Sequence, residues 1–306
     1  MSRSFKDYIG ISLKGLAMGA ADVIPGVSGG TIAFITGIYE ELITSIGNIN
    51  LGLFKTLKEK GIKPFWEELN GNFLISLAIG IGISLFTLMR LAHYLIESHP
   101  IKIWAFFFGL VLASVWFVAK QVTKWRLSTY IIFALGAIIA FGVTQLTPAG
   151  GANSNFYFFF AGAIAICAMI LPGISGAFIL LLLGVYKDAS EAVSRLDFEI
   201  ILIFGLGGIT GLLTFSKLLK WLFSNYKNMT LALLGGFILG SLNKIWPWKE
   251  VLKTEIIGGK TRIIAERSVL PANFDGENHM IFAIFLFIVG FLTIILLEKI
   301  GDKKTN

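Results

Sequence analysis

The chain has 306 residues, of which 55% are hydrophobic and only 15% are charged, and its mean hydropathy is +0.78. Soluble domains carry about a quarter charged residues, so this composition excludes an ordinary water-soluble fold. The net charge of +7 does not indicate nucleic acid, because Lys and Arg lie between apolar runs and not in a basic patch interleaved with aromatics.

The first predicted element covers residues 8–47 and is interrupted by a helix-breaking segment. Ile24-Pro25-Gly26-Val27-Ser28-Gly29-Gly30 separates two short apolar arms, at 8–24 and 31–47. A membrane span needs roughly 17–25 apolar residues, and Pro and Gly interrupt helices. We therefore expect a re-entrant helical hairpin that enters and leaves the bilayer on one face.

Three longer apolar runs follow, at 73–96, 101–119 and 129–146. Each is long enough to cross a bilayer as a helix. Together with the hairpin they form a predicted first repeat, residues 1–146.

A second copy of the breaker marks a second half. Leu171-Pro172-Gly173-Ile174-Ser175-Gly176 separates arms at 156–171 and 176–187, and residues 24–39 and 171–186 share seven identities in sixteen positions. Predicted spans at 199–223, 229–246 and 280–297 complete a second repeat, residues 156–298. Internal repeats of this kind are typical of transporters.

The two halves are predicted to be inverted, because three spans separate the hairpins and an odd number reverses the side of entry. Short cytoplasmic loops carry an excess of Lys and Arg, which places both termini in the cytoplasm. The basic residues assigned to that side are Arg3, Lys6, Lys14, Lys55, Lys58, Lys60, Lys63, Lys120, Lys124, Arg126, Lys217, Lys220, Lys227, Lys299, Lys303 and Lys304.

Residues 247–278 form the one soluble-looking segment, a predicted extracellular loop inserted in the second repeat. Its Glu255–Ile264 stretch, with Gly258-Gly259 at the centre, is typical of a β-hairpin. The predicted fold class is thus an all-α polytopic membrane protein. It has two inverted repeats, each a re-entrant hairpin plus three transmembrane helices, and a small extracellular β-hairpin.

The two breakers are the predicted functional site. A helix that starts inside the bilayer leaves backbone N–H groups without intrahelical partners, and such a helix start favours an anion. Ser28 and Ser175 could each cap the following helix, while Gly29, Gly30 and Gly176 leave the backbone uncovered. The alternative is that these small residues only allow close helix packing.

Matched cations lie in the spans. Arg90 aligns with Lys217, and His93, one helical turn after Arg90, aligns with Lys220. A cation within a span marks a pathway or a partner, so these side chains could receive a phosphate near one membrane face. Snorkelling of the long side chains to the interface is the alternative.

Asp22, just before Pro25, and Glu40, after the hairpin, are candidates for proton coupling; a structural pairing role is the alternative. With three scattered histidines and one cysteine, the sequence offers no metal site. It has no nucleotide-binding loop, and we expect no cofactor and no catalytic residues. The coupling ion and the oligomeric state stay open.

The segment from Gly19 to Thr31, followed by Gly37-Ile38-Tyr39-Glu40, resembles the bacterial membrane family catalogued as domain of unknown function 368, and the second motif is similar too. The resemblance covers nearly the whole chain. It implies a translocase that returns undecaprenyl phosphate to the cytoplasmic leaflet of the bacterial plasma membrane. It also implies head-group contacts from the two motifs, namely Pro25, Gly26, Ser28, Gly29, Gly30, Thr31, Pro172, Gly173, Ser175 and Gly176.

Two other functions are weighed against transport of this lipid. A polyprenyl-pyrophosphate phosphatase would carry Arg after the motif Ser, where Gly29 and Gly176 stand, and it would need a Glu cluster to activate a nucleophile. A transporter of a small soluble anion would use the same helix ends.

Overall fold

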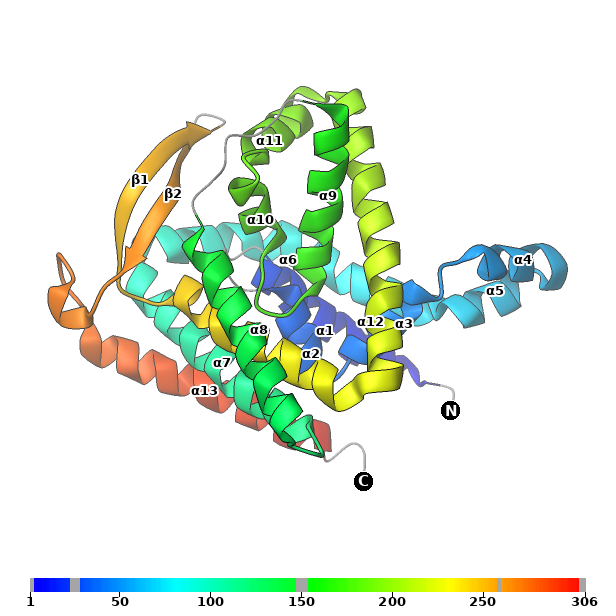
Figure 1. Ribbon diagram of the computed structural model, residues 1–306, viewed down its shortest axis with the longest axis horizontal. Coiled ribbons are helices and arrows are strands. Elements are labelled where there is room, and N and C mark those ends of the chain that lie inside the picture. Colours follow the sequence, from blue (N-terminus) through cyan, green and yellow to red (C-terminus); the bar gives the residue numbers. More distant parts are fainter. Residues whose placement is uncertain (1–2, 23–27, 147–153, 258–259, 303–306) are drawn as a thin grey trace.

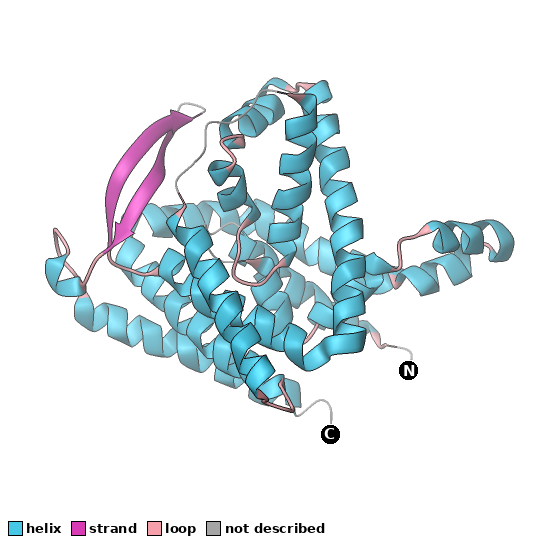
Figure 2. Cartoon of the chain, viewed as in Figure 1, coloured by secondary structure: helices cyan, strands magenta, loops and turns pink. Residues whose placement is uncertain are grey.

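The structure is a computed structural model that describes residues 3–22, 28–146, 154–257 and 260–302; within these ranges some side chains, including those of Arg90 and His93, are not described. The described chain is mostly helical with one β-hairpin (Figures 1 and 2). Its first half contains α1 (Phe5–Asp22), α2 (Gly29–Ile35), α3 (Tyr39–Gly47), α4 (Leu51–Lys60), α5 (Ile62–Leu69), α6 (Gly71–Ser98), α7 (Pro100–Gln121) and α8 (Leu127–Gln145). The second half contains α9 (Asn155–Ile170), α10 (Gly176–Leu182), α11 (Tyr186–Arg195), α12 (Phe198–Ser241), η1 (Leu242–Ile245), β1 (Lys249–Ile257), β2 (Lys260–Ser268), η2 (Pro271–Asn273) and α13 (Met280–Asp302).

The predicted spans correspond to long helices. By length and apolar composition, four of the described helices can cross a membrane, namely α6, α7, α8 and α12, while α9 and α13 provide shorter apolar stretches. The predicted spans 199–223 and 229–246 correspond to two helical arms that share the label α12 and meet at a kink, where Tyr226 leaves helical geometry with φ −136° and ψ 44°. The prediction of a helical, multi-pass membrane protein is confirmed.

The outer surface of these helices is apolar, as contact with lipid requires. On α6, Ile75, Ile79 and Ile83 are about half exposed, and Phe86 is 89% exposed. These residues recur every three or four positions and so share one helix face. A soluble protein rarely exposes such a continuous apolar stripe, which indicates a face covered by lipid.

The second arm of each predicted hairpin differs from expectation, because it is two helices and not one. Gly37 ends α2 with φ +72°, and Gly184 follows α10 with φ +69°. A left-handed backbone at these glycines stops the helix and turns the chain into α3 or α11. The connector before α6 also folds, into the short helices α4 and α5.

The long helices pack in pairs through glycines, and the contacts are equivalent in the two halves. Between α1 and α6, Gly80 lies against the carbonyl of Ser12; between α9 and α12, Gly207 lies against the carbonyl of Phe159. Similarly, Gly109 of α7 contacts α13, and Gly236 of α12 contacts α8. The third span of each half therefore packs on a helix of the other half, so that the halves interlock.

The predicted β-hairpin is present as the antiparallel pair β1 and β2, with Lys249 opposite Ser268 and Thr254 opposite Ile263. The predicted Gly258-Gly259 turn lies outside the described residues. Two indoles hold the base of the hairpin: Trp246 Nε1 donates to the carbonyl of Val269, just after β2, at 2.8 Å, and Trp248 Nε1 donates to the carbonyl of Asn278, just before α13, at 2.9 Å.

Candidate functional site

At the first helix break, the N–H groups that start α2 donate hydrogen bonds within the protein. The Gly29 N–H donates to Asp22 Oδ1 at 2.7 Å, and the Gly30 N–H donates to Ser28 Oγ at 3.1 Å. Ser28 thus caps α2 as predicted, but these two N–H groups, which the sequence suggested for an anion, already have protein acceptors. Pro25 and Gly26 lie outside the described residues.

The two breaks meet at the centre of the molecule. Ser28 Oγ lies 3.1 Å from the carbonyl oxygens of Met169 and Leu171, and the Gly173 N–H donates to Thr31 Oγ1 at 2.9 Å. Ser28 and Thr31 are each 1% exposed. Buried polar groups need partners, and here each motif supplies partners for the other.

Gly173 shows why the second motif needs glycine. Its φ is +86°, and a Cβ there would lie 2.8 Å from Ser241 Oγ and 2.9 Å from the Phe237 carbonyl oxygen. A side chain would therefore meet both backbone strain and a clash with the end of α12. The preceding Pro172 is buried.

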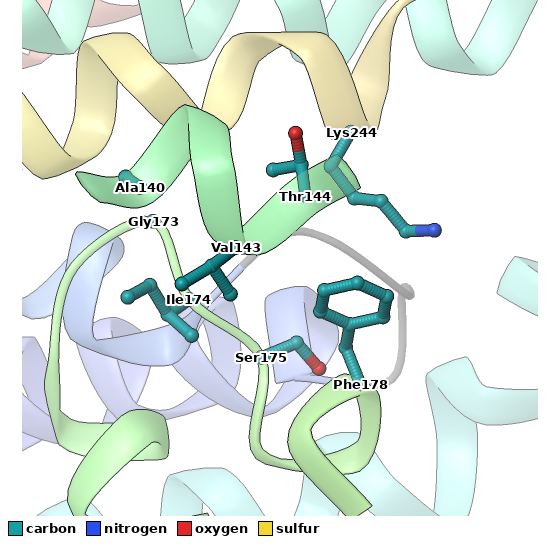
Figure 3. Close-up of a pocket in the computed structure, with 8 residues that line it drawn as sticks. All are labelled: Ala140, Val143, Thr144, Gly173, Ile174, Ser175, Phe178 and Lys244. Atoms are coloured by element: carbon teal, nitrogen blue, oxygen red, sulfur yellow. The ribbon is translucent and has the colours of Figure 1, made fainter. Parts of the chain in front are cut away.

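A small pocket lies directly after this second break (Figure 3). It is lined by the end of α8, the chain from Gly173 to Ser175, Phe178 of α10 and Lys244 of η1. Contrary to the prediction, Ser175 makes no capping hydrogen bond to α10, so its hydroxyl is available at the pocket. The pocket encloses about 10 Å³, which is about the space of one water molecule.

Lys244 supplies the positive charge of the pocket, although it is not among the site residues predicted from the sequence. Its Nζ lies 3.0 Å from Glu266 Oε1 of β2 and 4.4 Å from the centre of the Phe178 ring. Its side chain is only 22% exposed. The signal in the sequence was a lysine inside the predicted span 229–246, since cations within spans mark functional sites.

The β-hairpin holds Lys244 in place through a shared carboxylate. Lys249 Nζ also contacts Glu266 Oε1, at 2.8 Å, and donates to the Lys244 carbonyl. Burial alone would raise the pKa of Glu266, but the charges of Lys249 and Lys244 and their hydrogen bonds outweigh burial and lower that pKa below its ordinary value. Two ammonium groups thus share one carboxylate, leaving a net positive charge beside the pocket.

The remaining predicted residues lie away from this pocket. Lys217 is exposed on α12, and Glu40 forms an ion pair with Lys227 at 2.7 Å, about half exposed. Lys220 Nζ donates to Asn48 Oδ1 at 2.7 Å. Arg90 and His93 belong to α6, but their side chains are outside the described part of the chain.

Broken helices that meet inside a multi-pass helical membrane protein are an architecture typical of secondary transporters. Comparison with known proteins agrees with that class: the profile of the VCA0040-like, undecaprenyl phosphate translocase-like family matches residues 18–261. The chain therefore belongs to this family, which confirms the resemblance seen in the motifs.

Two relatives extend the comparison along the chain. It is 44% identical to a polyprenyl-phosphate transporter of Vibrio cholerae over 99% of this chain and 100% of the relative. It is 32% identical to a polyprenyl-phosphate transporter of Staphylococcus aureus over 77% of this chain and 85% of the relative. No solved structure matches significantly.

Proposed function

We propose that this protein moves undecaprenyl phosphate from the outer to the cytoplasmic leaflet of the bacterial plasma membrane and so recycles the cell-envelope lipid carrier. The family and the names of both relatives support transport of a polyprenyl phosphate. The main structural support for a binding site is the position of Lys244, a largely buried cation beside the second helix break.

The lining of the Lys244 pocket suits both parts of such a lipid. A phosphate monoester carries a charge of about −1.5 to −2 at pH 7, and Lys244 and the Ser175 hydroxyl can meet its oxygens. Ala140, Val143 and Ile174 are apolar and can contact the first units of the chain. The head group would replace Glu266 as the partner of Lys244, while Lys249 keeps that carboxylate charged.

Binding requires the pocket to widen. A volume near that of one water does not hold a phosphate, and Phe178 and Lys244 are the long side chains at its wall. Because Phe178 belongs to the short helix α10, a shift of α10 would open the pocket without disturbing the packed junction around Ser28 and Thr31.

The proposal includes the remaining predictions from the sequence. Two inverted repeats with re-entrant breaks would expose the site to each leaflet in turn, with both termini in the cytoplasm. Lys217 would receive the phosphate closer to the cytoplasmic face, and Arg90 and His93 closer to the outer face. Asp22 or Glu40 would carry a coupling proton. No catalytic step is part of the proposal.

The test is a leaflet-accessibility assay in proteoliposomes loaded with undecaprenyl phosphate, using an impermeant phosphatase outside. With wild-type protein the inner-leaflet lipid should become accessible, whereas in protein-free liposomes it should stay protected. Lys244→Gln removes a charge-assisted contact worth about 1.5–3 kcal/mol, so translocation should slow by about tenfold or more. The exposed Lys187 of α11 provides a matched control, Lys187→Gln, which should transport normally.

Three results would contradict the proposal. Wild-type transport by Lys244→Gln would remove the assigned role of that lysine. Uptake of inorganic phosphate into empty proteoliposomes would favour a soluble-anion transporter. Release of phosphate from undecaprenyl pyrophosphate by the pure protein would favour a phosphatase.

A further inference from the structure

A second pocket lies at the far end of the same helix pair. It has a volume of about 290 Å³ and is bordered by the start of α8, at Ser128 and Thr129, and by the bend of α12, from Asn225 to Met229. The Lys244 pocket lies at the other end of α8, at Ala140 to Thr144. An α-helix rises 1.5 Å per residue, so about 20 Å separates the two pockets along α8.

Figure 1 shows this arrangement: α8 runs from the bend of α12 toward the base of the β-hairpin. The bend produces the pocket, because the backbone at Tyr226 leaves helical geometry between the two arms of α12. Asn228 fixes the turn between α7 and α8 against this bend, since its Oδ1 accepts from the Thr123 N–H at 2.9 Å and from Thr123 Oγ1 at 3.2 Å. The cavity is therefore formed by elements that are tied together.

Three cations border this second pocket, namely Lys124, Arg126 and Lys227. Lys227 is paired with Glu40 of α3 at 2.7 Å. Within the described part of the chain, no ion pair involves Lys124 or Arg126, and both are exposed. Two of the three charges are thus available for an anion, and the Ser128 hydroxyl and Asn225 amide add hydrogen-bonding groups.

Aromatic rings on both sides indicate the depth of this pocket in the membrane. The Trp125 ring lies tilted against the Tyr130 ring with centres 4.8 Å apart, and the Trp221 ring meets the Tyr226 ring edge-on with centres 5.5 Å apart. Trp and Tyr gather at the membrane–water interface, which is also the depth of lipid phosphates. Basic side chains at this depth attract anionic head groups.

We infer that this pocket binds the phosphate of a lipid monophosphate at the membrane face opposite the Lys244 pocket. This inference rests on the proposed function, in which one head group leaves the first pocket and reaches the other leaflet beside the α8–α12 pair. The volume is close to the lower end of typical ligand sites and accommodates a phosphate without the widening that the Lys244 pocket needs.

The experiment measures binding of farnesyl phosphate to the purified protein by native mass spectrometry. All variants carry Lys244→Gln, so that the first pocket contributes little. Adding Lys124→Gln and Arg126→Gln should weaken farnesyl phosphate binding at least tenfold. Lys58→Gln with Lys63→Gln, an equal charge change on the α4 and α5 helices, should leave binding unchanged, and the conservative Arg126→Lys should retain it.

Further ligands identify the source of the phosphate. Inorganic phosphate and farnesol should each bind at least tenfold more weakly than farnesyl phosphate, and so should phosphatidylglycerol, a phosphodiester. Equal affinity for inorganic phosphate would overturn the assignment to a lipid, and equal affinity for phosphatidylglycerol would overturn the assignment to a monophosphate. Equal binding by the pocket variant and its control would overturn the site itself.

The transport assay separates this inference from the proposed function. Suppose that wild-type protein fails to translocate undecaprenyl phosphate while the variant with Lys124→Gln and Arg126→Gln still loses farnesyl phosphate binding. The second site is then supported and the proposed function is refuted. If transport proceeds while the pocket variant binds like its control, the second site alone is refuted.

Discussion

Ser28 and Ser175 occupy equivalent places in the two motifs but make different contacts. Ser28 caps α2 and bridges to carbonyls at the end of α9, whereas Ser175 makes no capping hydrogen bond and borders the Lys244 pocket. A polar group with buried partners stabilises the fold, and one at a pocket is available to a ligand. The same residue type thus has a structural role in one half and a proposed binding role in the other.

This difference predicts that Ser28→Ala lowers stability whereas Ser175→Ala lowers transport. Ser28→Ala should lower the free energy of unfolding by about 1–2 kcal/mol through loss of a cap and a bridge, measured by thermal unfolding in detergent. Ser175→Ala should leave stability nearly unchanged but slow translocation in the proteoliposome assay. Equal stability losses in both variants would show that Ser175 has an unseen structural partner.

Glu266 makes the attachment of the hairpin sensitive to acid. Its pKa is lowered in the folded protein, so its contribution to stability is complete above its unfolded pKa of about 4.5 and is lost as the pH falls through the lowered folded value. Glu266→Gln should destabilise the protein by about 3 kcal/mol at pH 7, because Lys249 loses its buried partner. The difference between wild type and Glu266→Gln in thermal unfolding should shrink as the pH falls below about 4.5.

Glu250 provides the control for this measurement on the same hairpin. It pairs with Arg267 at 2.7 Å, and the Arg267 side chain is 65% exposed. An exposed ion pair contributes roughly 0–1 kcal/mol, so Glu250→Gln should change stability little at any pH. A wild-type stability for Glu266→Gln at pH 7 would contradict the assigned role of the shared carboxylate.

At the level of the helices, close packing of a helix pair requires glycine on the face that meets the neighbouring helix. Gly207 lies so close to the Phe159 carbonyl of α9 that a Cβ has no room, whereas nothing lies within 4 Å of the position where Gly205 would carry one. Close approach of helices through small residues is how membrane helices gain packing energy. Two glycines on one helix therefore have unequal importance.

This contrast can be tested by replacing each glycine with alanine, which adds one methyl group. Gly207→Ala should destabilise the α9–α12 pair by about 1–3 kcal/mol through overpacking, while Gly205→Ala should be neutral or stabilise the helix by up to about 1 kcal/mol. Unfolding temperatures of the two purified variants provide the comparison. Equal unfolding temperatures would contradict the packing described for α9 and α12.

In the whole molecule, the third span of each half packs against a helix of the other half. Helix α8 of the first half packs on α12, and α13 of the second half packs on α7. The predicted boundaries 1–146 and 156–298 therefore describe a relation between sequences and not two separate folding units. The pockets proposed for the two faces both lie along the α8–α12 pair, which joins the halves.

The proposed orientation is a prediction for the whole chain. In a Cys167→Ser background, Lys253→Cys on β1 should react with an impermeant maleimide added to intact cells, and Lys58→Cys on α4 should react only after the membrane is permeabilised. This result is expected because the basic short loops are assigned to the cytoplasm. The reverse pattern would invert the proposed direction of transport.

The membrane class, the long helices, the β-hairpin and the two motifs could all be predicted from the sequence, since apolar run length, turn glycines and repeated motifs can be read along the chain without its fold. The sequence also indicated that Ser28 caps a helix. It did not indicate that Gly37 and Gly184 divide the second arms, because a glycine's φ depends on its surroundings.

Which groups come into contact depends on the folded chain. The N–H groups of Gly29 and Gly30 donate hydrogen bonds to Asp22 and Ser28 and are not free for an anion. The proposed binding cation is Lys244, which pairs with Glu266 of the β-hairpin and lines the same pocket as Ser175. Lys244 and Ser175 are far apart in the sequence and are joined only by packing, which periodicity and motif spacing do not encode. For the same physical reason, the pairing of α8 with α12 and of α13 with α7 emerged only from the folded chain.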